Sequence, residues 1–236
     1  LDVGDPASVR RFKRAIRASF EGFLRFTHRY WFHEVSDQAH ARQLFRMWTE
    51  HLGSERLYRY STALGFGSMT GVEFPGETAG RLRPVRAWQP RSTPTIAIGH
   101  EVTVTPLQLA LAYAAIANGG VLMQPMLVRA IRDADGREVR RASAQPSHRV
   151  FSEGTTATLM DMLCAVVDSG TATSARLGSI RIAGKTGTAQ KYDAAVGTYG
   201  RGMYLASFAG IAPADHPRLV GVVVIDEPRG SQYYGG

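Results

Sequence analysis

The chain has 236 residues and a formal net charge of +8 at pH 7, with 44% hydrophobic and 20% charged residues. These proportions are ordinary for a globular protein and allow a sizeable buried core. The single cysteine excludes an internal disulfide, and no apolar run approaches the ~18 residues that cross a bilayer. The N-terminus also lacks the order of basic, apolar and small residues found in signal peptides. We therefore expect the chain as given to carry no export signal and no membrane anchor.

Residues 1–51 differ from the rest because arginine, histidine and large aromatic residues are concentrated there. Glycine and proline are scarce in this stretch, which predicts helices over roughly 7–30 and 36–52. Its hydrophobic positions follow neither a period of two nor one of 3.6, so we leave 1–51 unassigned as a domain.

Two clusters in this stretch have a simple explanation. Five basic residues gather between Arg10 and Arg17, and we interpret them as a solvated basic face because no nucleic-acid-binding motif accompanies the charge. His33, Asp37 and His40 fall on one helical face, but they match no tight metal-ligand motif. We expect neither nucleic acid nor a metal ion as a partner.

From residue 52 onward the pattern is regular. A short helix is predicted over Ser54–Leu64, and a loop rich in proline and glycine over 72–94. Thr105 and Pro106 open a strong helix that runs to Ala117, because threonine caps free N–H groups and proline suits the first helical position. This helix is apolar nearly all round, which predicts a buried position.

A hairpin is predicted next, with strands Leu127–Arg132 and Arg137–Arg141 joined by a turn that ends in Asp-Gly. An amphipathic helix follows over Thr155–Asp168. Cys164 lies among apolar residues of that helix, so we expect a small buried side chain and not a nucleophile.

Three strands are predicted in the last third, over Ser179–Lys191, Met203–Ala212 and Arg218–Asp226. Their short connections favour antiparallel neighbours, since a parallel crossover needs about a dozen residues. Helices combined with an antiparallel sheet make α+β the expected fold class.

The first of these strands contains Lys185-Thr186-Gly187-Thr188. The lysine supplies a positive charge, and the two hydroxyls can bind a substrate carboxylate. Glycine leaves room for a ligand at the strand edge, where an extended peptide can pair as an extra strand. Alone, so short a motif is weak evidence for a site.

The surrounding segments strengthen this interpretation because several motifs follow one another in a fixed order. They are Gly65-Phe66-Gly67, Thr70-Gly71-Val72, Pro75-Gly76-Glu77, Ala97 to Ala110, Tyr113 to Gly120, Ser169-Gly170-Thr171-Ala172, Ala183 to Ala189 and Tyr233-Tyr234-Gly235-Gly236. Together they closely resemble the C-terminal part of the transpeptidase domain of class B penicillin-binding proteins. The resemblance covers 52–236, which we expect to be one domain, an antiparallel sheet flanked by helices.

The resemblance implies a serine acyl-transfer enzyme that cross-links peptidoglycan, with motifs S-x-x-K, S-x-N and K-T-G. Lys185 would move protons and attract the substrate carboxylate, which Thr186 and Thr188 would bind by their hydroxyls. The backbone N–H of Thr188 would form half of the oxyanion hole, and Gly187 would allow close approach. Peptidoglycan stem peptides and β-lactams are the implied ligands, without a cofactor. The implied location is the extracytoplasmic face of the bacterial membrane, in a division or elongation complex.

The chain departs from the family pattern at the other two motifs. The residues three positions before its three lysines are Arg10, Ile182 and Thr188, so S-x-x-K is absent. The only asparagine, Asn118, follows Ile116 by two positions, so S-x-N is absent as well. Ser36-Asp37-Gln38 is a poor substitute. Without the nucleophile we expect the chain alone to be inactive in acyl transfer.

Two further functions stay open. One is a non-catalytic module that binds peptidoglycan peptides or partner proteins through the retained groove, and the other is a serine β-lactamase, which shares the fold and the K-T-G strand. The start at Leu1 and the end at Gly236 suggest a fragment with an incomplete fold. We then expect apolar faces at Met203–Ala212 and Leu219–Ile225 to be partly uncovered.

Overall fold

The structure, a computed structural model, describes residues 53–97, 99–193, 198–229 and 235. The chain divides into two compact units, Leu1–Leu52 and Gly53–Gly236, and the described residues belong to the second. The helices predicted over 7–30 and 36–52, the basic cluster and His33, Asp37 and His40 lie outside them.

The described unit begins with three helical segments that precede its main helix. A helix covers 53–63, close to the predicted range. A short 3-10 helix, η1, spans Val85–Ala87, and helix α4 spans Ser92–Ala97. The predicted loop over 72–94 is therefore interrupted by η1 and wrong at its end, where α4 begins. Pro94 led to that prediction, but it lies in the first turn of α4, where its missing N–H is not needed.

Helix α5, Pro106–Ala117, has the bounds predicted from the sequence. The Thr105 hydroxyl accepts the backbone N–H of Gln108 at 3.1 Å, and the Gln108 side chain accepts the N–H of Thr105 at 2.8 Å. This reciprocal pair is a capping box. The predicted burial is correct only in part, because Gln108, Ala112 and Ala115 are the buried members of α5.

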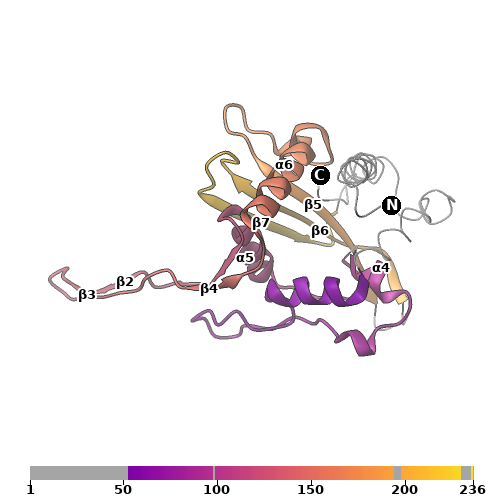
Figure 1. The fold of residues 1–236 in the computed structure, drawn as a ribbon, viewed down its shortest axis with the longest axis horizontal. Helices are drawn as coiled ribbons and strands as arrows, with labels where there is room; N and C mark the ends of the chain where they lie inside the picture. Colours follow the sequence, from indigo (N-terminus) through magenta and orange to yellow (C-terminus); the bar gives the residue numbers. More distant parts are fainter. Residues whose placement is uncertain (1–52, 98, 194–197, 230–234, 236) are drawn as a thin grey trace, which may run out of the picture. The chain divides into compact units, whose positions relative to one another are not determined.

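A long β-ribbon follows α5. Strand β1, Val121–Met123, pairs with β4, Pro146–Arg149, and between them β2, Ala130–Arg132, pairs with β3, Glu138–Arg141. Figure 1 shows β2 and β3 extending away from the helices and the main sheet. The predicted hairpin is confirmed, with shorter strands. The β1–β4 pair is not predicted from the sequence, because strands of three or four residues are too short to show a clear alternation of apolar and polar residues.

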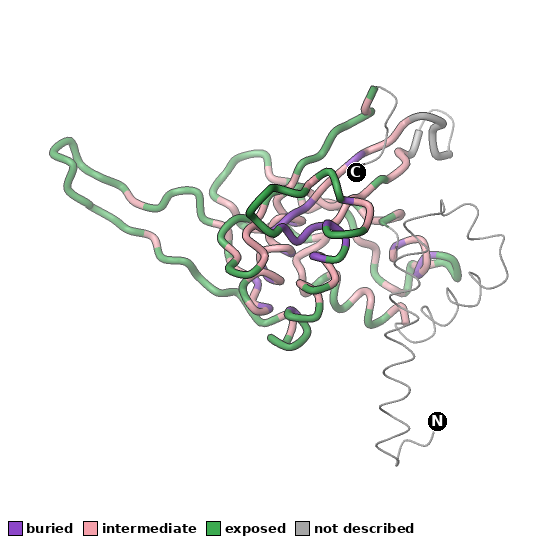
Figure 2. The backbone as a smooth tube through the Cα atoms, turned by 90° about the horizontal axis from the view of Figure 1, so that it is seen from above, coloured by how far each residue is buried: buried purple, intermediate pink, exposed green. Residues whose placement is uncertain are grey.

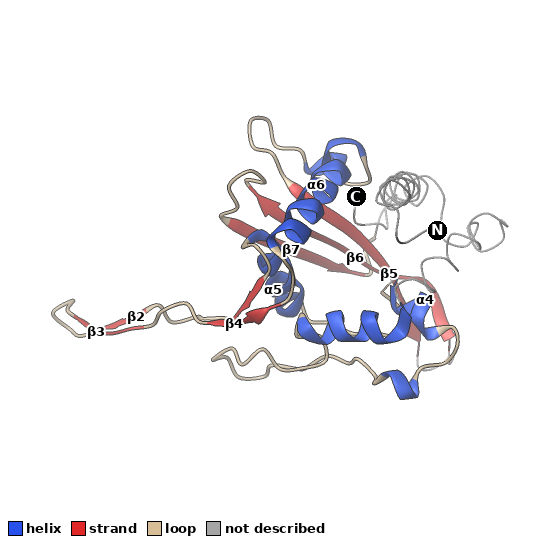
Figure 3. Ribbon diagram, in the orientation of Figure 1, coloured by secondary structure: helices blue, strands red, loops and turns tan. Residues whose placement is uncertain are grey.

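Helix α6, Glu153–Ser169, leads into the main sheet, which is shown in red in Figure 3. The sheet consists of β5, Ala183–Asp193, β6, Thr198–Ala212, and β7, Leu219–Asp226, antiparallel in the order β5-β6-β7. The predicted strands are confirmed, although β5 begins four residues later and β6 five residues earlier than expected. The α+β class is confirmed.

The core lies where α5 and α6 pack on one face of this sheet. Ala183 and Ile211 are register partners on β5 and β6, both 0% exposed, and they form a cluster with Cys164 of α6. Tyr113 of α5 packs against the same cluster. Cys164 is buried as predicted. Figure 2 shows many of the buried stretches near the middle of the described unit, whereas the β2–β3 ribbon is exposed along most of its length.

The opposite face of β7 is open among the described residues. Leu219, Val223 and Ile225 alternate with the core-facing residues and are 71%, 57% and 53% exposed. The predicted uncovered face is therefore confirmed for β7. It is wrong for most of Met203–Ala212, because β6 is the central strand and residues such as Ala206, Ala209 and Ile211 are buried.

Candidate functional site

The motif Lys185-Thr186-Gly187-Thr188 lies on β5, an edge strand within the described sheet. Alternation along the strand directs Lys185 and Gly187 to the face that carries α5 and α6, and Thr186 and Thr188 to the other face. The long lysine side chain nevertheless reaches Thr186, because its Nζ donates to the Thr186 carbonyl at 2.8 Å and to Oγ1 at 3.3 Å. The strand thus brings an ammonium group and a hydroxyl together.

Lys185 is a partly desolvated cation. Burial lowers the pKa of its ammonium group below the ordinary value of 10.5. No carboxylate among the described residues forms an ion pair with it. A half-buried cation that forms no ion pair with a described residue favours an anionic ligand, since the ligand would supply the missing charge.

A second hydroxyl joins this group from a distant part of the chain. Thr171, in the segment that follows α6, has its Oγ1 atom 2.7 Å from Oγ1 of Thr186. The Ser169-to-Ala172 segment belongs to the family resemblance, but its sequence gave no reason to place Thr171 at the site. No spacing rule links residues 15 positions apart across a loop.

The backbone of Gly187 lies close to a side chain of the neighbouring strand. A Cβ added to it would meet Oγ of Ser207, on the neighbouring strand β6, at 2.5 Å. Gly235 also approaches this part of the sheet, since its N–H lies 3.4 Å from Oγ1 of Thr188. A Cβ on Gly235 would meet the Ser207 carbonyl oxygen at 2.1 Å. A side chain at Gly235 would therefore displace backbone, whereas one at Gly187 would require the Ser207 hydroxyl to rotate away.

A groove of about 680 Å³ runs beside the second half of the motif. Gly187 and Thr188 line it, together with β5 residues as far as Lys191, whereas Lys185 and Thr186 do not. The facing wall is the segment 99–106, and Leu205, Ser207 and Val224 complete the sheet side. The motif therefore spans the groove and the adjoining lysine–threonine cluster.

Glu101 holds the facing wall in place. Its backbone has a φ of 58°, which lies in the left-handed region. This conformation is energetically unfavourable for any residue other than glycine. The carboxylate accepts the hydroxyls of Thr95 at 2.6 Å and Ser92 at 2.8 Å, and it forms an ion pair with Arg83. Burial alone would raise the pKa of Glu101, but these hydrogen bonds and the charges of Arg83 and Arg91 lower it overall. Glu101 therefore stays charged and ties the wall to α4.

Gln108 anchors the same wall from α5. Its side chain is fully buried, and Nε2 lies 3.1, 2.7 and 2.9 Å from the carbonyl oxygens of Gly65, Ser68 and Ala79. One side chain thus links the groove wall, through the helix cap at Thr105, to two earlier loops.

The part of the chain that the structure describes shows neither a metal-binding cluster nor a membrane-spanning helix. It contains no group of three or more His, Cys, Asp or Glu side chains able to hold a metal ion. None of its helices is both long enough and apolar enough to cross a membrane.

Comparison with known proteins identifies relatives of the whole region. A profile of the penicillin binding protein transpeptidase domain matches residues 34–236. Its start at residue 34 lies inside the stretch 1–51, which showed no resemblance by its motifs.

Two curated relatives share more than a third of their aligned residues with the chain. It is 38% identical over 188 residues to stage V sporulation protein D of Bacillus subtilis, covering 79% of this chain and 29% of that protein. It is 37% identical over 190 residues to penicillin-binding protein PbpB of Mycolicibacterium smegmatis, covering 78% and 29%. The chain thus spans under a third of the length of these two relatives.

Solved structures give the same result. Penicillin-binding protein 3 of Mycobacterium tuberculosis, complexed with aztreonam, has a TM-score of 0.73 and 36% identity over 78% of this chain and 43% of that one. The D,D-transpeptidase domain of a peptidoglycan glycosyltransferase from Eggerthella lenta has a TM-score of 0.66 and 29% identity over 79% and 46%.

Proposed function

Because this chain belongs to the penicillin binding protein transpeptidase domain family, we propose that β5 is the carboxylate-binding side of a peptidoglycan D,D-transpeptidase site. The observation that carries the proposal is the convergence of Lys185 Nζ, Thr186 Oγ1 and Thr171 Oγ1 within hydrogen-bonding distance. A cation and two hydroxyls with no acidic side chain among them suit a ligand carboxylate.

The substrate of this site is the D-alanyl-D-alanine end of a peptidoglycan stem peptide, and β-lactams occupy the same place. Lys185 attracts the terminal carboxylate, and the hydroxyls of Thr186 and Thr188 hold it. The peptide lies along the β5 edge past Gly187, with its scissile carbonyl oxygen at the N–H of Thr188, which is half of the oxyanion hole.

The complete reaction requires a serine that this sequence does not contain in the S-x-x-K motif. The serine oxygen bonds to the substrate carbonyl carbon while the bond to the terminal D-alanine nitrogen breaks, and that nitrogen takes up a proton. An amine of a second stem peptide then displaces the serine oxygen and completes the cross-link. We therefore propose that the 236-residue chain alone binds these ligands but does not carry out acyl transfer. The complete transpeptidase, of which this chain would be a part, would act in a division or elongation complex at the extracytoplasmic face of the membrane.

Incubation with a fluorescent penicillin tests this assignment. Binding without acylation leaves no label on a denaturing gel. A labelled band that disappears when the protein is boiled before incubation would contradict binding without acyl transfer, because it would reveal a working nucleophile. Hydrolysis of a chromogenic cephalosporin would instead favour the serine β-lactamase interpretation.

A further inference from the structure

A second groove lies between the loop at 70–73 and the base of the β2–β3 ribbon. Its volume is about 380 Å³, and no residue that lines it also lines the groove along β5. That volume falls within the range of roughly 300–1,000 Å³ found for ligand pockets. Thr70, Gly71 and Glu73 form the loop wall, and Met126, Ile131 and Arg140 lie on the ribbon wall.

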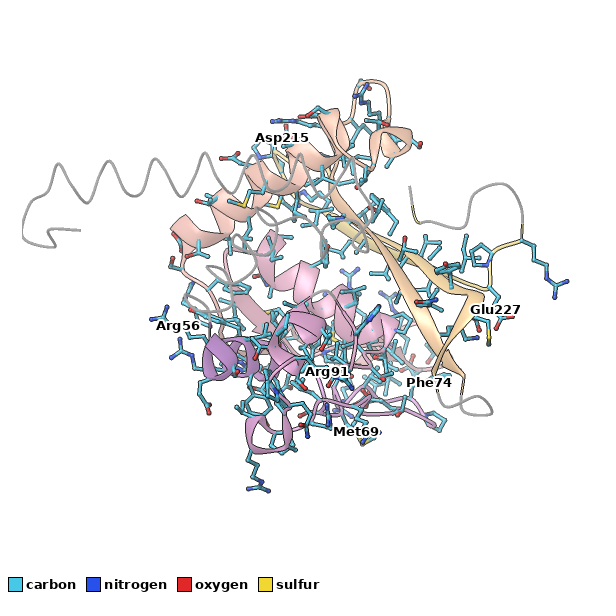
Figure 4. All side chains as sticks on the ribbon, turned by 90° about the vertical axis from the view of Figure 1, so that its right-hand side faces the viewer. Arg56, Met69, Phe74, Arg91, Asp215 and Glu227 are labelled. Carbon is cyan, nitrogen blue, oxygen red and sulfur yellow. The ribbon has the colours of Figure 1, made fainter. Side chains whose placement is uncertain are left out.

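The loop wall is fixed in advance of any ligand. The carboxylate of Glu77 accepts the backbone N–H of Thr70 at 2.6 Å, its hydroxyl at 2.5 Å and the N–H of Gly71 at 3.2 Å. The hydrogen bond from the Thr70 hydroxyl contributes most to lowering the pKa of Glu77, so the carboxylate stays charged. Met69 and Phe74 of the same loop, both labelled in Figure 4, are 63% and 66% exposed. A wall tied in this way needs little reordering when it binds.

The ribbon wall combines apolar surface with one uncompensated positive charge. Ile131 and Arg140 are register partners, and Ile131 is 48% exposed. Glu138 accepts two hydrogen bonds from Arg141, at 2.6 and 2.8 Å, and lies 4.0 Å from Arg132. Arg140 forms no ion pair within the described residues, so its charge is left for a ligand. A two-stranded ribbon is marginally stable alone, which favours a partner that covers its apolar side chains.

The two walls carry opposite charges. Glu73 is exposed and forms no ion pair with any residue that the structure describes. The groove is thus lined by one negative charge on the loop wall and one positive charge on the ribbon wall, neither in an ion pair with a described residue, and by the apolar side chains of Met126 and Ile131. An anionic lipid surface or a nucleic acid would meet repulsion from Glu73, whereas a ligand with both charges complements the two walls.

We propose that this groove binds an extended peptide segment of a partner protein. The segment carries a carboxylate that pairs with Arg140, an ammonium or guanidinium group that pairs with Glu73, and an apolar side chain between them that covers Met126 and Ile131. This site does not depend on the function assigned to β5, since the two grooves share no lining residue.

Synthetic peptides with the whole 236-residue chain test this site. The probes are capped peptides of equal length with a central pair of valines, flanked by Glu and Lys in either order, by two Glu or by two Lys. Calorimetry or fluorescence anisotropy gives each dissociation constant. We expect the better Glu/Lys order to bind at least about 10-fold more tightly than either single-sign peptide, since a tenfold ratio requires about 1.4 kcal/mol.

Charge-swap variants show whether the walls themselves recognise the peptide. Arg140→Glu and Glu73→Arg should each weaken binding of the preferred peptide about 10-fold. The double variant should regain affinity for the peptide of opposite order, a rescue that a merely structural effect cannot give. Arg137→Glu is the matched control, because it makes the same charge change at the exposed turn outside the groove, and it should alter affinity less than about twofold.

Several results would overturn the proposal. These are failure of every peptide to bind, equal losses in Arg137→Glu and Arg140→Glu, or a preferred peptide order that the double variant leaves unchanged. Tighter binding of the two-Glu peptide, or Arg140-dependent binding to phosphatidylglycerol vesicles, would replace it with a simple anion-binding surface.

Discussion

Replacing Gln108 of α5 by glutamate should strongly destabilise the described unit. The side chain is fully buried, and its amide nitrogen lies within 3.1 Å of three backbone carbonyl oxygens. Gln108→Glu preserves the acceptor that caps Thr105, but it replaces the amide donor with a carboxylate oxygen. The carbonyl oxygens of Gly65, Ser68 and Ala79 would then face another acceptor.

The size of the effect follows from the lost donors. An amide nitrogen has two hydrogens, so at most two strong hydrogen bonds disappear, each worth about 1 kcal/mol net. Leaving buried carbonyls unpaired and burying a charge adds a cost of similar size, for a total of about 3–5 kcal/mol at neutral pH. That total is a large share of the roughly 5–15 kcal/mol that stabilises a typical domain.

The pH dependence of the loss is a second signature. Burial against carbonyl oxygens raises the pKa of the introduced carboxyl in the folded state above its unfolded value. A raised folded pKa means that folding favours the protonated form, so the variant should recover stability, relative to wild type, as pH falls from neutral toward about 5.

Urea unfolding followed by circular dichroism measures both effects. Gln108→Met removes both the amide donor and the acceptor that caps Thr105, but it adds no charge, so it should lose about 2–3 kcal/mol with no pH dependence of its own. Gln89→Glu, at an exposed position, should change stability by less than about 0.5 kcal/mol. A loss below about 1 kcal/mol for Gln108→Glu would refute the role given to Gln108.

Three further changes test other parts of the account. Gly80→Ala should lower the thermal stability more than Gly76→Ala, because a Cβ at Gly80 would meet the Thr103 carbonyl oxygen at 2.3 Å. Gly76 is the control, since it shares the positive φ but has open space around it. Equal losses would mean that backbone strain alone is responsible. The affinity for a D-alanyl-D-alanine peptide should fall, as pH rises, before the ordinary lysine value of 10.5 is reached, since burial lowers the pKa of Lys185 and only its protonated form attracts the carboxylate. Lys185→Arg should bind without that fall if the geometry is kept, because arginine stays charged. Cys164 is 4% exposed, and burial raises the pKa of its thiol. A thiol reagent should therefore modify it at least about 100-fold more slowly in the native protein than in urea. Equal rates would contradict the packing of α6 on the sheet.

The sequence predicts those features of the fold that local chemistry determines. The bounds of α5 follow from Thr105 and Pro106 at one end and Asn118 at the other, all within one helical turn of the boundary. The three strands of the main sheet and their antiparallel order follow from apolar runs joined by short connections. By contrast, α4 cannot be predicted from the sequence because it contains Pro94. A proline in the first turn is compatible with a helix, but that position cannot be recognised without knowing where the helix begins.

The candidate site shows the same division. The K-T-G stretch on β5 can be predicted from its own residues and from the order of the motifs that surround it in the sequence. Thr171, Glu101 and Gln108 were not assigned roles, because their contacts join segments that no helical or strand period connects. Gln108, for example, reaches carbonyl groups 29 to 43 positions earlier in the chain. Such contacts exist only after the loops have folded against α5.

Reversible binding of a D-alanyl-D-alanine peptide to β5 tests the central claim most directly. The predicted result is saturable, non-covalent binding that Thr186→Val weakens about 10-fold, since a hydrogen bond to a charged group is worth about 1.5–3 kcal/mol. Thr62→Val removes an exposed hydroxyl that bonds within its own helix, so it should leave affinity unchanged. Absence of saturable binding, or equal affinity in wild type and Thr186→Val, would contradict the assignment of β5 as the carboxylate-binding strand.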